Sequence, residues 1–199
     1  LCLFGSFTCQ TPDRARQFVR MDVSVSPDKT VTARSCLIPA GETPQAALAA
    51  YLAPLDKENA QYLDTPIGRL DTELTPDPHL DMAKNGSYIA NFFNQVQLEA
   101  SGADLSATSL GNEVKGFARS VTIRDVVATY IFPNTLKTLE VDRTVLKAAL
   151  ERSAEYFALD TDGKLTISDA FLHPIAQHYN FDYISGLDVT ADIRRAVGD

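Results

Sequence analysis

The chain has 199 residues, of which 45% are hydrophobic and 22% are charged, a composition typical of a globular protein that buries its core without disulfide or metal staples. Its 18 basic and 26 acidic residues give a formal net charge of −8, which disfavours proteins that track nucleic acid polymers or dock on anionic membranes. A site for a single nucleotide is not excluded, because it needs only one local pocket.

The start of the chain has the pattern of neither a signal peptide nor a membrane span. Residues 1–5 are apolar but lack a basic flank, and no stretch approaches the roughly 18 apolar residues that a span requires. We therefore expect no membrane insertion. The chain opens on Leu1 with part of a hydrophobic segment, as a piece of a longer protein would.

A β-hairpin is predicted first. Residues 18–25 alternate apolar and polar side chains, residues 26–29 have turn chemistry, and residues 31–38 alternate again. This period and this turn together favour two antiparallel strands.

A long helix is predicted next. Thr43-Pro44 supplies a cap residue and a proline at the first helical position, and the amphipathic pattern ends near Thr65-Pro66. Pro54 lies inside the helix and is expected to kink it or divide it in two. Residues 70–78 follow as a polar, ordered loop.

The remaining chain holds the best-formed elements. The patterns predict helices over residues 89–100, 123–127 and 145–157, and strands over residues 103–109, 135–141, 164–167, 181–184 and 187–193. Gly102 ends the first of these helices, and Thr122 with Asp125 forms a capping box for the second. Because strands and helices both alternate and cluster, the fold class is α+β (mixed α/β).

The aspartates around Gly163 partly match a calcium-binding loop. With Gly163 at the turn position, Asp160, Asp162 and Asp169 fall on ligand positions, but the first ligand position is Ala158, which cannot coordinate calcium. The same residues fit an Asp-Gly hairpin turn, and we favour the turn.

No other motif indicates catalytic chemistry. The histidines are His79, His173 and His178, and the cysteines are Cys2, Cys9 and Cys36. None has metal-ligand spacing, the cysteines allow at most one disulfide, and no nucleophile motif such as Gly-x-Ser-x-Gly occurs. The sequence therefore predicts no catalytic residues and no cofactor within these 199 residues.

One segment, residues 130–136, suits ligand recognition. It lies between a predicted helix and a predicted strand, and so at the end of a sheet strand, where ligand crevices form in α/β sheets. Phe132 offers a stacking face, Pro133 fixes a turn, and Asn134 offers an amide that can pair with a base edge. From spacing alone, ordinary packing is the more common role of such an aromatic ring.

Several stretches together resemble the C-terminal domain of the 5′-nucleotidase family. They are residues 102–107, 121–127, 130–136 and 146–153. Residues 94–97, 112–114 and 178–182 resemble in particular the branch of bifunctional 2′,3′-cyclic-nucleotide 2′-phosphodiesterase/3′-nucleotidases. The resemblance covers residues 65–199 and implies the mixed α/β fold of that domain.

The resemblance implies a division of labour in a longer enzyme. Residues 1–42 would be the terminal strands of a truncated metallophosphoesterase domain, residues 43–66 a linker helix, and residues 67–199 a substrate-binding domain truncated at its C-terminus. The family's metallophosphoesterase domain holds two divalent metal ions and performs the hydrolysis, so this fragment alone is expected to be inactive and free of metal. Members are typically exported, which implies a periplasmic, cell-wall or extracellular location.

The resemblance also assigns substrate-binding residues for a nucleotide or nucleoside. The family holds the nucleoside between two aromatic rings, and Phe132 matches the first ring. Asn134 matches an asparagine that contacts the base, and Tyr130 belongs to the same motif. The second ring lies beyond Asp199, and the ligand-binding arginines of the 5′-nucleotidase branch have no counterpart, so Asn112 is the candidate to replace them.

Two other interpretations stay open. The chain could be a non-catalytic secreted binding or adhesion module that uses the 160–169 loop for calcium. It could also be a structural domain in which the Phe132 loop only packs against its own chain.

Overall fold

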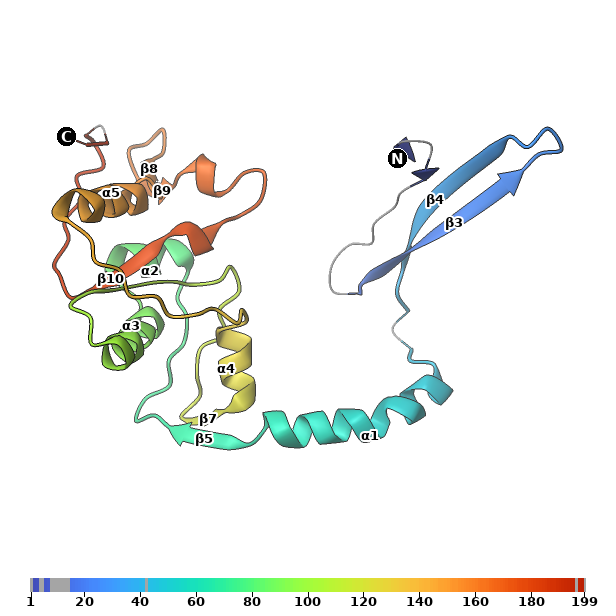
Figure 1. Ribbon diagram of the computed structural model, residues 1–199, viewed down its shortest axis with the longest axis horizontal. Coiled ribbons are helices and arrows are strands. Elements are labelled where there is room, and N and C mark those ends of the chain that lie inside the picture. Colours follow the sequence, from blue (N-terminus) through green and yellow to red (C-terminus); the bar gives the residue numbers. More distant parts are fainter. Residues whose placement is uncertain (1, 4–5, 8–14, 42, 196, 199) are drawn as a thin grey trace. The chain divides into compact units, whose positions relative to one another are not determined.

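The computed structural model describes residues 2–3, 6–7, 15–41, 43–195 and 197–198 (Figure 1). Helices and strands are mixed along the chain, which confirms the α+β prediction. The chain divides into two compact units, Leu1–Glu58 and Asn59–Asp199, and each is described here by itself.

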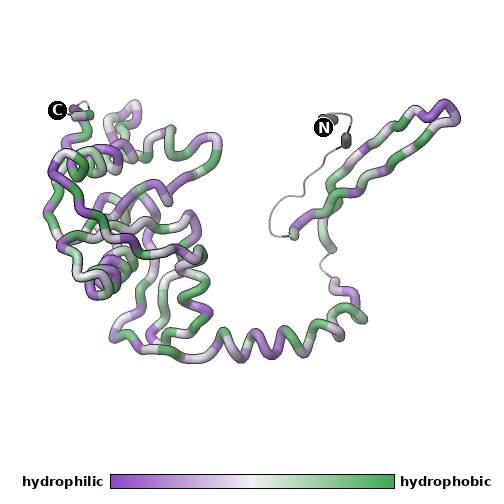
Figure 2. The backbone as a smooth tube through the Cα atoms, viewed as in Figure 1, coloured by the Kyte–Doolittle hydropathy of each residue, from purple (hydrophilic) through white to green (hydrophobic). Residues whose placement is uncertain are grey.

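A long β-hairpin is the main element of the first unit. Strands β3 (Gln17–Val25) and β4 (Val31–Pro39) pair antiparallel over their whole length, which confirms the predicted hairpin. The carboxylate of Asp28 holds the turn by accepting hydrogen bonds from the hydroxyls of Ser26 at 2.5 Å and Thr30 at 2.9 Å. The alternating hydropathy that predicted the hairpin can be followed along both strands (Figure 2).

The first unit also contains a short strand pair and most of a helix. Strand β1 (Cys2–Leu3) pairs antiparallel with β2 (Ser6–Phe7). Helix α1 (Ala46–Leu63) stays one helix although Pro54 lies inside it, so the predicted division does not occur. Proline removes one N–H donor, but the alanine, leucine, lysine and glutamate around it are strong helix formers. No residue of α1 is buried.

Three two-stranded antiparallel pairs organise the second unit. Strand β5 (Pro66–Arg69) pairs with β7 (Ser120–Thr122), β6 (Ser106–Ser109) with β10 (Asp182–Ser185), and β8 (Phe157–Leu159) with β9 (Leu165–Ile167). The strands predicted at residues 103–109, 164–167 and 181–184 correspond to β6, β9 and β10, and are confirmed with shifted ends.

Four helices and two short 3₁₀ turns accompany these strands. They are α2 (His79–Asn85), α3 (Tyr88–Ser101), α4 (Ile123–Thr129), α5 (Arg143–Ala154), η1 (Asp169–Phe171) and η2 (His178–Asn180). The predicted end signals are confirmed: Gly102 has the left-handed φ of 67° that ends α3, and Thr122 with Asp125 forms the capping box of α4.

Three sequence predictions about these elements are wrong. No strand forms over residues 135–141 or 187–193. An extended segment needs a neighbouring strand for its backbone hydrogen bonds, and neither segment has one in the described part of the chain. The helix predicted over residues 145–157 ends at Ala154, and Phe157 begins β8 instead. Helix α2 was not predicted, because its start carries no capping signal: Pro78 precedes it and makes no side-chain cap hydrogen bond.

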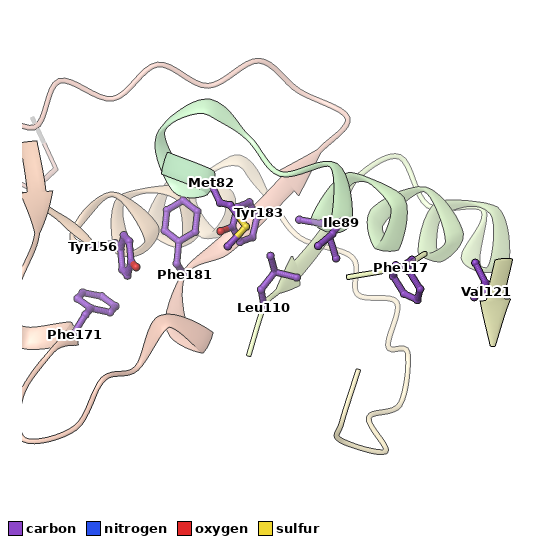
Figure 3. Close-up of a cluster of buried hydrophobic side chains, with 10 residues drawn as sticks. Met82, Ile89, Leu110, Phe117, Val121, Tyr156, Phe171, Phe181 and Tyr183 are labelled. Atoms are coloured by element: carbon purple, nitrogen blue, oxygen red, sulfur yellow. The ribbon is translucent and has the colours of Figure 1, made fainter. Parts of the chain in front are cut away.

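A single cluster of buried side chains forms the core of the second unit (Figure 3). Its members are Met82, Ile89, Ala90, Leu110, Phe117, Val121, Tyr156, Phe171, Phe181 and Tyr183. The buried Asn94 ties α3 to the β6–β10 pair: its Nδ2 donates to the Tyr183 carbonyl and its Oδ1 accepts from the Ser106 hydroxyl, both at 2.8 Å. Among the described residues, no helix is both long and apolar enough to cross a membrane.

Candidate functional site

The loop that the sequence singles out for ligand recognition is anchored where α4 ends. The amide of Tyr130 donates to the Val126 carbonyl at 2.8 Å, and the hydroxyl of the buried Thr129 donates to the Gly116 carbonyl at 2.7 Å. Residues 131–141 then continue without helix or strand. The capped helix therefore fixes the position from which the loop departs.

Phe132 and Asn134 stand on either side of a tight turn in this loop. The amide of Asn134 donates to the Phe132 carbonyl at 2.8 Å, and Pro133 between them has a fixed φ. The Phe132 side chain is 60% exposed, so its ring is not part of the core. An exposed ring keeps its π face for stacking on a ligand.

Tyr130 holds the side chain of Asn134. The Nδ2 of Asn134 donates to the Tyr130 hydroxyl at 3.2 Å. The Tyr130 ring in turn packs edge to face on Phe93 at 5.2 Å between ring centroids, and Phe93 packs in the same way on the buried Phe117 at 6.0 Å. A row of aromatic rings thus links the amide of Asn134 to the core.

A groove of about 1000 Å³ lies beside the loop. Tyr130, Asn134 and residues 135–139 form one wall, and residues of α3, β5 and β6 contribute to the others. Its apolar lining includes Phe92, Phe93, Val96, Leu105, Val121 and Leu136. Phe132 does not line the groove, so the structure brings Tyr130 and Asn134 together there and leaves the Phe132 ring outside it.

Asn112, the fourth substrate-binding residue predicted from the sequence, has its own set of contacts. Its Nδ2 donates to the Ala176 carbonyl at 2.7 Å, and its Oδ1 accepts from the His178 amide at 3.0 Å. Its backbone carbonyl accepts a hydrogen bond from Nε2 of His79 at 3.0 Å. Asn112 has no described contact with Tyr130, and its role toward a substrate stays a prediction.

The histidines form a contact that sequence reasoning missed. The rings of His79 and His178 stack with centroids 3.9 Å apart and an interplanar angle of 16°. Nδ1 of His178 also lies 2.7 Å from the hydroxyl of the buried Tyr156. Burial lowers the pKa of His178, and the nearby charge of His79 lowers it further. No local spacing signals this pair, because its members come from distant parts of the chain.

The aspartates around Gly163 make a turn, as favoured from the sequence. Strands β8 and β9 pair on either side, and the Asp160 carboxylate accepts hydrogen bonds from the amides of Asp162 at 2.9 Å and Lys164 at 2.8 Å. Within the described residues, no group of three or more His, Cys, Asp or Glu could hold a metal ion. Cys36 is a free, exposed thiol, and the side chains of Cys2 and Cys9 lie outside what the structure describes.

Comparisons with known proteins match most of the chain. The family model of the 5′-nucleotidase C-terminal domain matches residues 66–199. A crystal structure described as a 5′-nucleotidase from Staphylococcus aureus, in complex with alpha-ketoglutarate, matches with a TM-score of 0.75 and 33% sequence identity. The match covers 88% of this chain and 34% of that chain. No curated protein matches the sequence.

The fold and the matched region define a domain of a hydrolase family that acts on nucleotides. The chain belongs to the 5′-nucleotidase family, and residues 66–199 form its C-terminal domain. It spans 34% of the length of the matched Staphylococcus aureus structure.

Proposed function

We propose that residues 66–199 bind the nucleoside part of a nucleotide for a metal-dependent phosphohydrolase of the 2′,3′-cyclic-nucleotide 2′-phosphodiesterase/3′-nucleotidase branch. The exposed ring of Phe132, one proline away from Asn134, carries this proposal. The two divalent metal ions and the hydrolysis are assigned to a metallophosphoesterase domain outside these residues, because the described residues do not supply the ligands. We also propose that the protein is exported. Its ligand is a single nucleotide or nucleoside and not a nucleic acid polymer.

The loop offers a base two kinds of contact. Stacking on an aromatic ring contributes about 1–3 kcal/mol per base and tolerates any base, because every base has a π face. The Asn134 amide uses one N–H on the Tyr130 hydroxyl, which leaves its second N–H and its carbonyl oxygen for the ligand. A donor and an acceptor side by side match the edge of an adenine.

Such contacts act at a distance from the reacting phosphorus. Binding energy gained at the base holds the phosphate ester in place at a metal centre and so lowers the entropic part of the barrier. The domain therefore contributes positioning rather than bond breaking, and we expect the 199-residue chain itself not to hydrolyse 2′,3′-cyclic AMP. Turnover of this compound by the purified chain would contradict the assignment of hydrolysis to another domain.

The test of the binding role is a set of substitutions at Phe132, with adenosine affinity measured by calorimetry or NMR titration. Phe132→Ala and Phe132→Leu should weaken binding by about tenfold, because each removes the ring, whereas Phe132→Tyr should bind like the wild type. Tyr88→Ala is the matched control, because this aromatic residue is 80% exposed on α3 and lines neither the groove nor the loop. Equal affinity of the wild type and Phe132→Ala would overturn the proposal.

A longer enzyme that contains this domain allows a second measurement. Phe132→Ala should raise KM for nucleotides there and leave KM for a simple phenyl phosphodiester unchanged, because the phenyl ester has no base to stack. A parallel rise for both substrates would mean that Phe132 affects the reacting centre instead of the base.

A further inference from the structure

Two histidines and an asparagine join three separate segments of the second unit. His79 is the first residue of α2, His178 is the first residue of η2, and Asn112 lies in the segment 110–117 between β6 and β7. The two imidazole rings stack on each other. Each histidine also forms a hydrogen bond of 3.0 Å with Asn112, His79 through Nε2 and His178 through its backbone amide. We refer to His79, Asn112 and His178 as the clasp.

The hydrogen bonds of the clasp restrict where its protons are. A carbonyl oxygen only accepts, so Nε2 of His79 carries a proton and donates to the Asn112 carbonyl. A neutral His79 therefore has no proton on Nδ1. Both nitrogens of a protonated imidazole are donors, so Nδ1 of a protonated His178 can meet the Tyr156 hydroxyl only as a donor.

We propose that the clasp is a pH-sensitive device, which holds α2, the 110–117 segment and the 172–180 segment together while its imidazoles are neutral and opens when both become protonated. Two positive charges on rings stacked at 3.9 Å repel each other, and this repulsion is strongest where protein shields the pair from water. Opening separates the rings and frees the Asn112 side chain from the His178 amide.

Most of the carboxylates near the clasp do not pair with its imidazoles. The ionisable groups on the segments that meet at the clasp are Asp81 and Lys84 of α2, Glu113 and Lys115 of the 110–117 segment, Arg152 and Glu155 at the end of α5, His173 and Tyr179 of the 172–180 segment, and Tyr156, Asp169 and Asp182. Arg152 pairs with Glu155 and lies 4.9 Å from the centre of the Phe171 ring. In the described part of the chain, Asp81, Asp169 and Asp182 form no ion pair with either imidazole of the clasp.

The sign of the pH effect follows from the environment of His178. Burial and the charge of His79 lower its pKa below the ordinary value of 6.5, so the folded chain takes up this proton less readily than the unfolded chain. The stabilising contribution is therefore complete above about pH 6.5 and is lost as the pH falls through the folded pKa. Mild acid opens the clasp and neutral pH closes it.

The test follows the histidine rings and the His178 amide of the full chain by NMR. In the wild type, the titration midpoint of His178 should lie below 6.5. Protection of its amide from hydrogen exchange, corrected for intrinsic rates, should fall about tenfold or more between about pH 7 and about pH 5. His79→Gln should raise the His178 midpoint, because it removes the neighbouring charge. His173→Gln is the matched control and should leave it unchanged, since His173 is exposed and lies on the same segment outside the clasp.

Two results would overturn the proposal. One is a His178 midpoint that His79→Gln does not move, and the other is equal protection of the His178 amide at both pH values. If His79→Gln fails to fold, Asn112→Ala replaces it: loss of the Oδ1 acceptor should remove protection of the His178 amide already at about pH 7. Retained protection in Asn112→Ala would equally contradict the clasp.

Discussion

Among the described glycines, Gly116 leaves the least room for a side chain. Its φ is +79°, and a Cβ added to it would lie 2.0 Å from the carbonyl oxygen of Leu74. That carbonyl cannot move away freely, because it accepts a hydrogen bond from the Phe117 amide at 2.8 Å. We expect Gly116→Ala to lower the free energy of unfolding by at least about 3 kcal/mol, measured by urea denaturation.

Gly111 provides the matched control for this substitution. No atom lies within 4 Å of a Cβ added to Gly111, and its φ is not positive. Gly111→Ala should therefore keep wild-type stability to within about 0.5 kcal/mol. Similar stabilities for the two variants would show that the backbone of Gly116 and Leu74 is not in this close approach.

The site residues differ in how far sequence could reach them. Phe132 and Asn134 were predicted because residues 130–136 resemble a motif of the family, and the turn between them is closed by a local hydrogen bond from the Asn134 amide to the Phe132 carbonyl. The stack of His79 on His178 could not be predicted, because only the tertiary fold brings α2 and η2 together. The sequence also could not show that the side chain of Asn112 forms hydrogen bonds with the backbone carbonyl of Ala176 and the backbone amide of His178.

Among the elements, α4 shows most directly how a local signal prepares the ligand loop. The Asp125 carboxylate accepts hydrogen bonds from the Thr122 amide and hydroxyl, both at 2.8 Å, and so closes the first turn of the helix. The last turn of the same helix passes into Tyr130. Asp125→Ala should lower the free energy of unfolding by about 1 kcal/mol and weaken adenosine binding, because α4 then frays.

A control for the cap comes from the same helix. Val127 is half exposed, and alanine is a better helix former than valine, so Val127→Ala should not reduce stability. For both variants, chemical denaturation measures the free energy of unfolding, and amide hydrogen exchange measures fraying of α4. If Asp125→Ala and Val127→Ala were equally stable, the capping box would not be what starts this helix.

Elements that carry their own end signals could be predicted, and elements that need a distant partner could not. The alternating pattern of β3 and β4 predicts the hairpin correctly because the short connection of residues 26–30 brings the partner strand alongside. Residues 135–141 have a similar local pattern but no partner strand in the described chain, and residues 135–139 line the groove instead. Strand β5 shows the converse case: it was not predicted from its local sequence, but it forms because the tertiary structure brings β7 beside it.

For the whole molecule, stability should reside in the second unit. All members of the buried cluster lie between Met82 and Tyr183, whereas none of the described residues from 15 to 58 is buried. Since burial of apolar surface is the main stabilising contribution to folding, the first unit adds little to the free energy of unfolding of the second. This organisation predicts that the second unit folds without the first.

Deletion of residues 1–58 tests this independence directly. The shortened chain begins at Asn59, keeps the last turn of α1, and should melt within about 2 °C of the full chain in calorimetry or circular dichroism. It should also keep the adenosine affinity of the full chain, because the loop that contains Phe132 lies entirely in the second unit. A shortened chain with a much lower Tm would mean that the second unit depends on residues 1–58 for its stability.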